Sequence, residues 1–169
     1  MNLVIVRHAD AGDSEEFAKT GKPDNLRPLS DKGRKQMRDA ANGLRALVPK
    51  ADLVATSPYT RAVQTAKIVA DAFEDVEQET TATLEPDSAL DDFEEWINDH
   101  DALDVVIVVG HEPHLGELAT WLMAGKSESR IELKKGGACL LAFGGDVKKG
   151  DGMLQWLLTG KQLAREAPG

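Results

Sequence analysis

Residues 3–11 read LVIVRHADA, and residues 105–119 read VVIVVGHEPHLGELA. In both stretches an uninterrupted apolar run of strand length is followed by one further residue and then by a histidine, His8 or His111. Apolar runs without alternation are typical of strands that are buried on both faces of a parallel sheet. Amphipathic segments of helix length separate such runs along the chain. The sequence therefore predicts an α/β fold, a three-layer sandwich with a mostly parallel central sheet.

Turn residues and apolar spacing predict the other elements. We expect further strands over 52–56, within 75–84, over 138–143 and over 153–158. We expect helices after Ser30, over 57–73, over 87–100 and over 115–123. Ser30 and Ser57 are expected to act as N-caps, with Pro58 in the first turn of its helix.

The end of the chain and the segment after the first strand have a different character. A Gly- and Lys-rich turn separates the last two expected strands, so we expect an antiparallel hairpin at the sheet edge. Residues 10–29 contain several Gly and Pro residues and are expected to form a long polar loop. Residues 160–169 are expected to form a loose tail. We expect residues 1–169 to be a single domain.

Composition excludes several classes of function. The chain has 169 residues, of which 41% are hydrophobic and 29% charged, as in an ordinary globular protein. Its net charge of −9 argues against general nucleic-acid binding, which needs a basic face. The apolar runs are too short to cross a bilayer, and the start MNLVIVRHAD lacks the features of a signal peptide. A lone cysteine, Cys139, fits a reducing cytoplasm, where we expect the protein to be located.

Four residues are expected to meet at one edge of the sheet. Arg7 and His8 follow the first buried strand, and His111 follows the strand over 104–109. Ligands of open α/β sheets bind beyond the carboxyl ends of the strands, where these side chains would lie. Arg61 falls in the first turn of the helix expected after the 52–56 strand. A cation at a helix N-terminus opposes the helix dipole, so it should have an anion to hold. Together these four residues predict a phosphate-binding site that contains a potential nucleophile.

These residue types suit phosphoryl transfer. A neutral imidazole is a good nucleophile toward phosphorus at physiological pH. Guanidinium groups and a second imidazole stabilise the charge that accumulates on the equatorial oxygens. Because Arg7, Arg61 and His111 already supply this stabilisation, we expect no metal ion and no other cofactor.

With these motifs the sequence resembles the histidine phosphatase superfamily, which has the phosphoglycerate mutase-like fold, and in particular its small SixA-type phosphohistidine phosphatase branch. The resemblance implies that His8 is the phosphorylated nucleophile and that Arg7, Arg61 and His111 bind the phosphate. Its stretches cover nearly the whole chain in the order of the family: LVIVRHADA (3–11), RPLSDKGRKQ (27–36), LVATSPYTRAVQTA (53–66), VVIVVGHEPHLGELA (105–119) and LQWLLTGKQL (154–163).

Two features depart from the family pattern. Ala9 stands where the family's RHG triplet has glycine, which is a modest change at this turn. The mutase members carry long insertions that include a glutamate proton donor, and this chain has no room for them. Glu85, in LEPDS, comes nearest in order and is our candidate for that acid. A phosphoamidate such as phosphohistidine has a labile P–N bond, so it would need less help from an acid than an alkyl phosphate ester does.

The function therefore has three candidate forms. The first is an enzyme that removes phosphate from phosphohistidine on a protein, as in a phosphotransfer signalling relay. The second is a phosphatase of small phosphate esters, and the third is a phosphate-dependent binding module without turnover. The roles of Asp10, Asp13 and His114 stay open: the two aspartates could orient the loop or contact substrate, and His114 could line the entrance or simply begin a helix.

Overall fold

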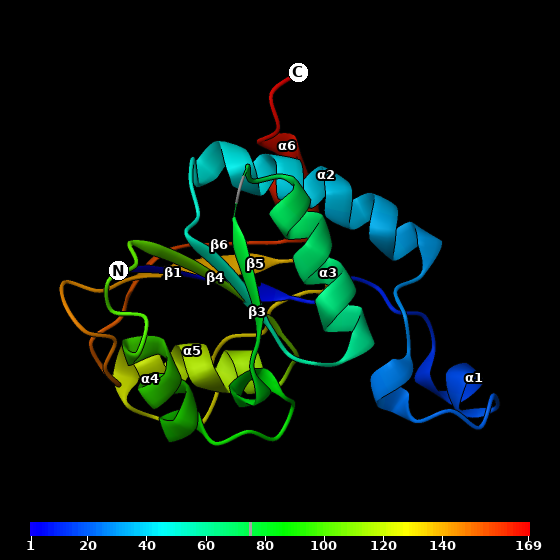
Figure 1. Ribbon diagram of the computed structural model, residues 1–169, viewed down its shortest axis with the longest axis horizontal. Coiled ribbons are helices and arrows are strands. Elements are labelled where there is room, and N and C mark those ends of the chain that lie inside the picture. The colour runs from blue at the N-terminus through cyan, green and yellow to red at the C-terminus, as the bar shows by residue number, and fades with distance from the viewer. Residues whose placement is uncertain (75) are drawn as a thin grey trace.

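A computed structural model describes residues 1–74 and 76–169 of the chain. Its strands form one mixed sheet in the order β3-β2-β4-β1-β5-β6, with helices on both faces (Figure 1). The strands are β1 (Asn2–Arg7), β2 (Leu53–Thr56), β3 (Glu77–Thr80), β4 (Val105–Gly110), β5 (Ala138–Ala142) and β6 (Met153–Leu158). The first four strands are parallel, and β5 and β6 are antiparallel to their neighbours. The predicted fold class is thus confirmed. Asp75, where one expected segment begins, lies outside the described residues.

The sheet separates two hydrophobic clusters. On one face, residues of α2 (Asp31–Leu47), α3 (Thr60–Asp71) and α6 (Gly160–Arg165) pack against alternate strand residues such as Val4 and Ile107. On the other face, α4 (Leu90–Asn98) and α5 (His114–Ala124) cover the intervening residues, such as Ile5 and Val108. All strand residues of β2 and β4 are buried, which explains why their sequences are mostly apolar and do not alternate.

The pairing of β1 with β4 determines where the two histidines lie. These strands are parallel neighbours, and Arg7 is in register with Gly110. The next residue of each strand is a histidine, so His8 and His111 emerge side by side at the carboxyl edge. The backbone N–H of His8 donates to the carbonyl of Gly110 at 3.0 Å and continues the ladder to this point. β2 lies on the other side of β4 and brings Ser57 to the same edge.

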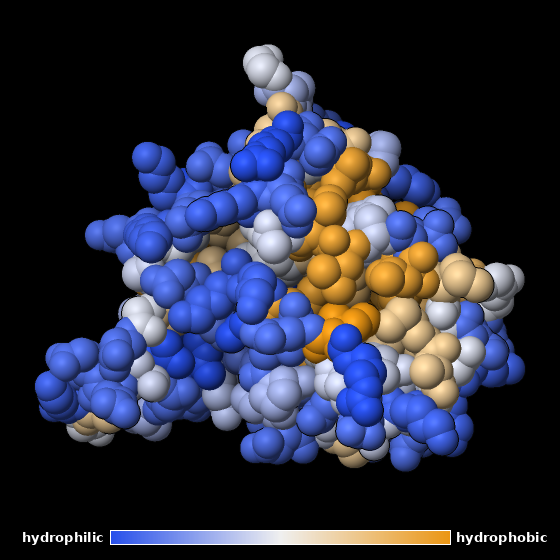
Figure 2. Space-filling view, turned by 180° about the vertical axis from the view of Figure 1, so that it is seen from behind, coloured by the Kyte–Doolittle hydropathy of each residue, from blue (hydrophilic) through white to orange (hydrophobic). Residues whose placement is uncertain are grey.

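The hairpin expected at the sheet edge is confirmed, since β5 pairs with β6 and β6 is the outermost strand. Large apolar side chains remain exposed on β6, namely those of Met153, Leu154 and Leu157. The side of the molecule opposite to that of Figure 1 shows a band of apolar surface (Figure 2). No helix in the described ranges is both long enough and apolar enough to cross a membrane.

Our prediction of a loose tail was wrong. Residues Gly160–Arg165 form the short helix α6, which begins with a capping box between Thr159 and Gln162. Leu163 is fully buried against α2. The close approach depends on Gly43 of α2, because a Cβ at this position would collide with the carbonyl of Leu163. The prediction failed because the segment is mostly polar, and its packing depends on one buried leucine.

Two further predictions need correction. Residues 10–29 are not one loop but contain α1 (Ser14–Ala18), capped by the Asp13 side chain, and the 3₁₀ helix η1 (Asp24–Leu26). Helices of one turn leave no periodic apolar pattern that could have predicted them. Helix α3 begins at Thr60, three residues later than expected, and Ser57 does not cap it. The Ser57 hydroxyl is instead bonded to His111.

Candidate active site

His8 is held in a defined tautomer at the end of β1. It is 7% exposed, and its Nδ1 lies 2.7 Å from the carbonyl oxygen of Ala9. A carbonyl only accepts hydrogen bonds, so the neutral ring carries its proton on Nδ1 and keeps the lone pair of Nε2 free. Burial, together with the charges of Arg61, Arg7 and Arg27, lowers the pKa of His8 to about 4. The ring is therefore neutral, with Nε2 available as a nucleophile, throughout the physiological range.

His111 lies beside His8 as the strand pairing requires. The ring centroids are 5.2 Å apart. Nε2 of His111 is 2.8 Å from the Ser57 hydroxyl, which also accepts the backbone N–H of Tyr59. We assign the Ser57 proton to the bond with Nε2, which leaves the ring proton of His111 on Nδ1. Burial and the neighbouring His8 and Arg61 lower the pKa of His111 to about 3. His111 is thus a neutral hydrogen-bond donor beside His8.

The two predicted arginines flank the histidines. Arg7 donates from Nη1 to the carbonyl of Leu133 at 2.8 Å, and Arg61 is only 6% exposed, in the first turn of α3. Within the described part of the chain, neither guanidinium has a partner for its buried Nε. The Nδ1 of His111 is also buried without a partner there. Buried donors are normally satisfied, so this group of unpaired nitrogens fits an anion-binding site.

An acidic residue from the 10–29 segment completes the surroundings of Arg61. Nη1 of Arg61 lies 3.0 Å from the backbone carbonyl of Asp24 and 3.2 Å from its carboxylate. The same carboxylate accepts from Nε of Arg27 at 2.9 Å. Burial opposes the ionisation of Asp24, but the hydrogen bonds and charges of the two arginines outweigh it and lower its pKa. The Arg61 guanidinium also lies over the Tyr59 ring, 5.0 Å from its centroid.

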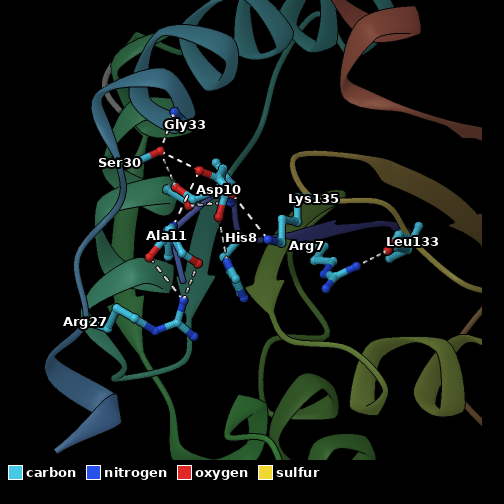
Figure 3. A network of polar contacts seen from close by, with 12 residues as sticks. Arg7, His8, Asp10, Ala11, Arg27, Ser30, Gly33, Leu133 and Lys135 are labelled. Carbon is cyan, nitrogen blue, oxygen red and sulfur yellow. Dashed lines mark hydrogen bonds and ion pairs between the residues drawn. The ribbon is translucent and has the colours of Figure 1, made fainter. Parts of the chain in front are cut away.

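Sequence reasoning missed Arg27 and Thr65 as members of the site. Arg27 also donates from Nη1 to the carbonyls of Ala11 and Gly12, so it ties the loop after His8 to η1 (Figure 3). The buried hydroxyl of Thr65 accepts the N–H of Ala9 and donates to the carbonyl of Arg61. It therefore links the turn of His8 to the helix that carries Arg61. Both residues lie in motifs that had been recognised, RPLS and TRAVQTA, but their roles depend on tertiary contacts.

Asp10 orients the loop rather than the reacting groups. Its carboxylate accepts from the Ser30 hydroxyl at 2.6 Å and from Lys135 at 3.2 Å (Figure 3). Its carbonyl accepts from the backbone N–H of Ser30, the residue that caps α2. Gly33 allows this approach, because a Cβ there would collide with the Asp10 carbonyl. One of the two roles left open for Asp10, loop orientation, is therefore the one that its contacts favour.

Glu112 is a second residue that the sequence did not single out. It directly follows His111, and burial raises the pKa of its carboxyl to about 7, against the lowering effects of the Gly116 N–H and of Arg7. One carboxylate oxygen, Oε1, is buried without a hydrogen-bond partner among the described residues. A carboxyl with a strongly raised pKa next to a catalytic candidate is a recurrent mark of functional sites.

The remaining candidates lie around this group. His114 is the first residue of α5, as one of our two alternatives held, and its Nε2 contacts the carbonyl of Ser88 at 3.1 Å. Asp13 caps α1 through its side chain. Glu85 lies in the turn after the 3₁₀ helix η2 (Ala82–Leu84), and its backbone N–H donates to Ala82. Among the described contacts, none joins the Glu85 side chain to His8 or His111. Its role as an acid stays a prediction.

The described residues contain no group of three or more His, Cys, Asp or Glu side chains arranged to hold a metal ion. Positive charge at the edge comes from guanidinium groups. A site with fixed arginines, an uncharged imidazole with a free Nε2 and a second imidazole N–H can bind a tetrahedral oxyanion and attack it.

The sequence is similar to those of known proteins. Residues 3–86 match the protein family described as Histidine phosphatase superfamily (branch 1). An uncharacterized protein of Picosynechococcus sp. (strain ATCC 27264 / PCC 7002 / PR-6) is 33% identical over 146 residues, which cover 85% of this chain and 86% of that protein.

Solved structures share the fold at lower identity. The protein histidine phosphatase SixA, complexed with tungstate, superposes with a TM-score of 0.82 at 24% identity, over 96% of this chain and 99% of its own. The alpha-ribazole phosphatase of Shigella flexneri gives a TM-score of 0.73 at 15% identity, over 95% and 97%. A phosphoserine phosphatase of Entamoeba histolytica, in complex with 3-phosphoglyceric acid, gives 0.68 at 14%, over 96% and 98%.

Proposed function

Because the chain belongs to the histidine phosphatase superfamily, we propose that it removes phosphate from phosphohistidine on a protein, through a phosphorylated intermediate on His8. The observation that supports this proposal most directly is the environment of the two ring nitrogens of His8. Its Nδ1 is bonded to the Ala9 carbonyl, which leaves Nε2 free, and the neighbouring Arg7, Arg61 and His111 each have a buried nitrogen without a partner among the described residues. A phosphoryl group placed against Nε2 would satisfy these donors. Tungstate, itself a tetrahedral oxyanion, is present in the structure of SixA, which has the same fold.

The first step transfers the phosphoryl group to His8. The Nε2 lone pair attacks phosphorus and forms a P–N bond, while the bond from phosphorus to the leaving nitrogen or oxygen breaks. The leaving atom keeps that electron pair and takes up a proton. Arg7, Arg61 and the N–H of His111 stabilise the charge on the three equatorial oxygens. The Nδ1–H bond to Ala9 grows stronger as the ring becomes positive, so it orients the ring and stabilises the product of this step.

The second step regenerates the enzyme. Water attacks the phosphorus of phospho-His8, the P–N bond breaks and its electron pair returns to Nε2; both protons of the water leave with the inorganic phosphate or pass from it to solvent. A low pKa for His8 makes its imidazole a good leaving group, because neutral imidazole is favoured in this buried environment. The same environment that keeps the nucleophile unprotonated thus helps to release it.

A phosphohistidine substrate is compatible with a site in which no carboxyl group among the described residues is hydrogen-bonded to either of the two histidines. The leaving imidazole needs less proton assistance than an alkoxide, and the contacts of the described residues do not join Glu85 to the histidines. We propose that guanidinium and imidazole groups provide the electrostatic stabilisation of the reaction, and that no metal ion takes part. Relatives of this fold include phosphatases of small molecules, so esters are the competing substrate class.

The test is a substrate panel combined with trapping of the intermediate. Wild-type protein is assayed with a phosphohistidine-bearing phosphotransfer protein, phosphoramidate, sugar phosphates and an aryl phosphate. We expect the phosphohistidine protein to give the highest kcat/KM. Rapid acid-free quenching with labelled substrate should give an acid-labile, alkali-stable adduct on His8, which His8→Ala should lack together with turnover. An adduct on another residue, or an active His8→Ala protein, would contradict the mechanism. A preference for sugar phosphates would instead favour the small-molecule function.

A further inference from the structure

The contact between Asp24 and Arg61 is an unusual feature of this site. Arg61 would be one of the cations that bind the phosphoryl group, yet its Nη1 already touches an internal carboxylate at 3.2 Å. That carboxylate is shared with Arg27, whose Nε lies 2.9 Å from it. One negative charge is thus shared by two guanidinium groups. The backbone carbonyl of Asp24 contacts the same Nη1, so the residue is fixed by its main chain as well as by its side chain.

Asp24 lies at the mouth of the site. Its side chain is 52% exposed, whereas that of Arg61 is 8% exposed and that of Arg27 is 12% exposed. The carboxylate is therefore on the solvent side of both guanidinium groups. It comes from the segment that carries α1 and η1, which projects from the body of the molecule (Figure 1). A phosphoryl group seated against His8 must direct its leaving group toward solvent, because the substrate enters from there.

The charge of Asp24 changes what this mouth attracts. Without it, two guanidinium groups at the entrance would favour any additional anionic group on the substrate. The carboxylate cancels one of these charges and repels a second anion brought close to it. A neutral or cationic leaving group, such as imidazole or an amine, does not meet this repulsion.

We propose that Asp24 is a specificity-determining residue, which discriminates against phosphorylated substrates whose leaving group carries a carboxylate or a second phosphate, in favour of substrates with neutral or cationic leaving groups. This inference rests on the proposed function, because it assumes that the phosphoryl group binds at His8. The inference adds that the charge of the leaving group influences which substrates the protein accepts. It assigns to Asp24 no part in the transfer itself.

Binding of two phosphonates tests the inference without any need for turnover. The probes are 4-carboxyphenylphosphonate and 4-(aminomethyl)phenylphosphonate, which cannot be hydrolysed and differ in the charge at one end. Their Kd values are measured by calorimetry at one salt concentration. Asp24→Asn should shift the ratio of the two Kd values by about tenfold in favour of the carboxylate compound, the effect of one unit charge a few ångströms away. Asp24→Glu, which keeps the charge, should stay within about threefold of the wild-type ratio.

A matched control separates this effect from a general change of charge. Asp71 pairs with Lys67 at the exposed far end of the helix that carries Arg61, so Asp71→Asn should leave the ratio unchanged. An unchanged ratio in Asp24→Asn, or an equal loss of affinity for both probes, would overturn the inference and leave Asp24 only a support for the arginines. Thermal unfolding of each variant shows whether the fold is retained. If wild-type protein bound neither phosphonate, the phosphate site itself would be refuted, and the inference with it.

Discussion

Replacing Glu112 by glutamine should stabilise the protein at neutral and alkaline pH, and leave its stability nearly unchanged at acid pH. Burial raises the pKa of this carboxyl from 4.5 to about 7, so the folded state resists its ionisation while the unfolded state does not. Between these two values the folded protein binds more protons than the unfolded one. Stability is therefore lost as the pH rises through this interval, and the loss is complete above the folded pKa.

The size of the effect follows from the same values. A change from 4.5 to about 7 corresponds to roughly 3 kcal/mol at full effect. Glu112 as a whole is partly exposed, and solvent screening reduces this figure, so we expect Glu112→Gln to gain about 1–2 kcal/mol at pH 8.5. Glutamine retains an oxygen that can accept the N–H of Gly116. For a chain of this size the gain corresponds to a rise in Tm of about 2–8 °C. At pH 4.5 the gain should fall below about 0.5 kcal/mol, because Glu112 is then protonated in the folded state and only half ionised in the unfolded state.

Urea unfolding of the two proteins at pH 4.5 and pH 8.5 measures this difference. Protonation of His8 and His111 at acid pH affects both proteins alike and cancels in the comparison. Glu128→Gln is the control, because Glu128 is exposed and pairs with Arg130 at 3.0 Å. It should change the free energy of unfolding by less than about 0.5 kcal/mol at either pH. An equal stability of wild type and Glu112→Gln at pH 8.5 would show that the carboxyl is not held in an unfavourable environment.

Two further predictions concern the reaction. Excess chelator should leave kcat/KM for the phosphohistidine protein unchanged, since Arg7 and Arg61 provide the positive charge; complete loss that a divalent ion restores would mean that a metal takes part. Glu85→Gln should barely alter the phosphohistidine rate, whereas general acid help to an alkoxide is worth about a hundredfold to ten-thousandfold. Fast hydrolysis of a sugar phosphate that collapses in Glu85→Gln would identify Glu85 as an acid and favour the small-molecule function.

The parts of the fold that were predictable are those in which local sequence and tertiary packing agree. The runs over 3–6 and 105–109 have no alternation because both faces of β1 and β4 are covered, and this pattern is readable without coordinates. The same strand ends predicted that His8 and His111 would lie together, as they do. Arg61 could be placed for a similar reason, because it follows a buried strand and opens a helix.

Tertiary contacts decide the parts that were not predictable. Ser57 has the sequence context of a helix cap, but the strand order brings His111 within 2.8 Å of its hydroxyl, and this contact replaces capping. α6 is polar apart from Leu163, and only the close approach of Gly43 shows that it packs on α2. Asp24 and Arg27 lie in a segment without periodicity, and their importance appears only when the chain folds back onto α3.

Among the described residues, the buried polar side-chain atoms that lack a hydrogen-bond partner all lie at or shortly after the carboxyl ends of β1, β2 and β4. In the part of the chain that the structure describes, every buried side-chain nitrogen or oxygen without a hydrogen-bond partner belongs to one small set: Arg7, Arg61, His111, Glu112 and His114. Each such atom costs stability, because desolvation is not compensated by a bond. Selection for stability alone would favour sequences in which such unpaired buried atoms are absent. Three of these atoms, Nε of Arg7, Nε of Arg61 and Nδ1 of His111, are N–H donors on residues that neighbour His8, so a bound phosphoryl group would recover their share of the unfavourable energy. When the carboxyl of Glu112 is ionised, its buried Oε1 has no hydrogen to donate and gains nothing from such an anion; its burial instead raises the pKa of the carboxyl to about 7, and this is the effect that Glu112→Gln removes.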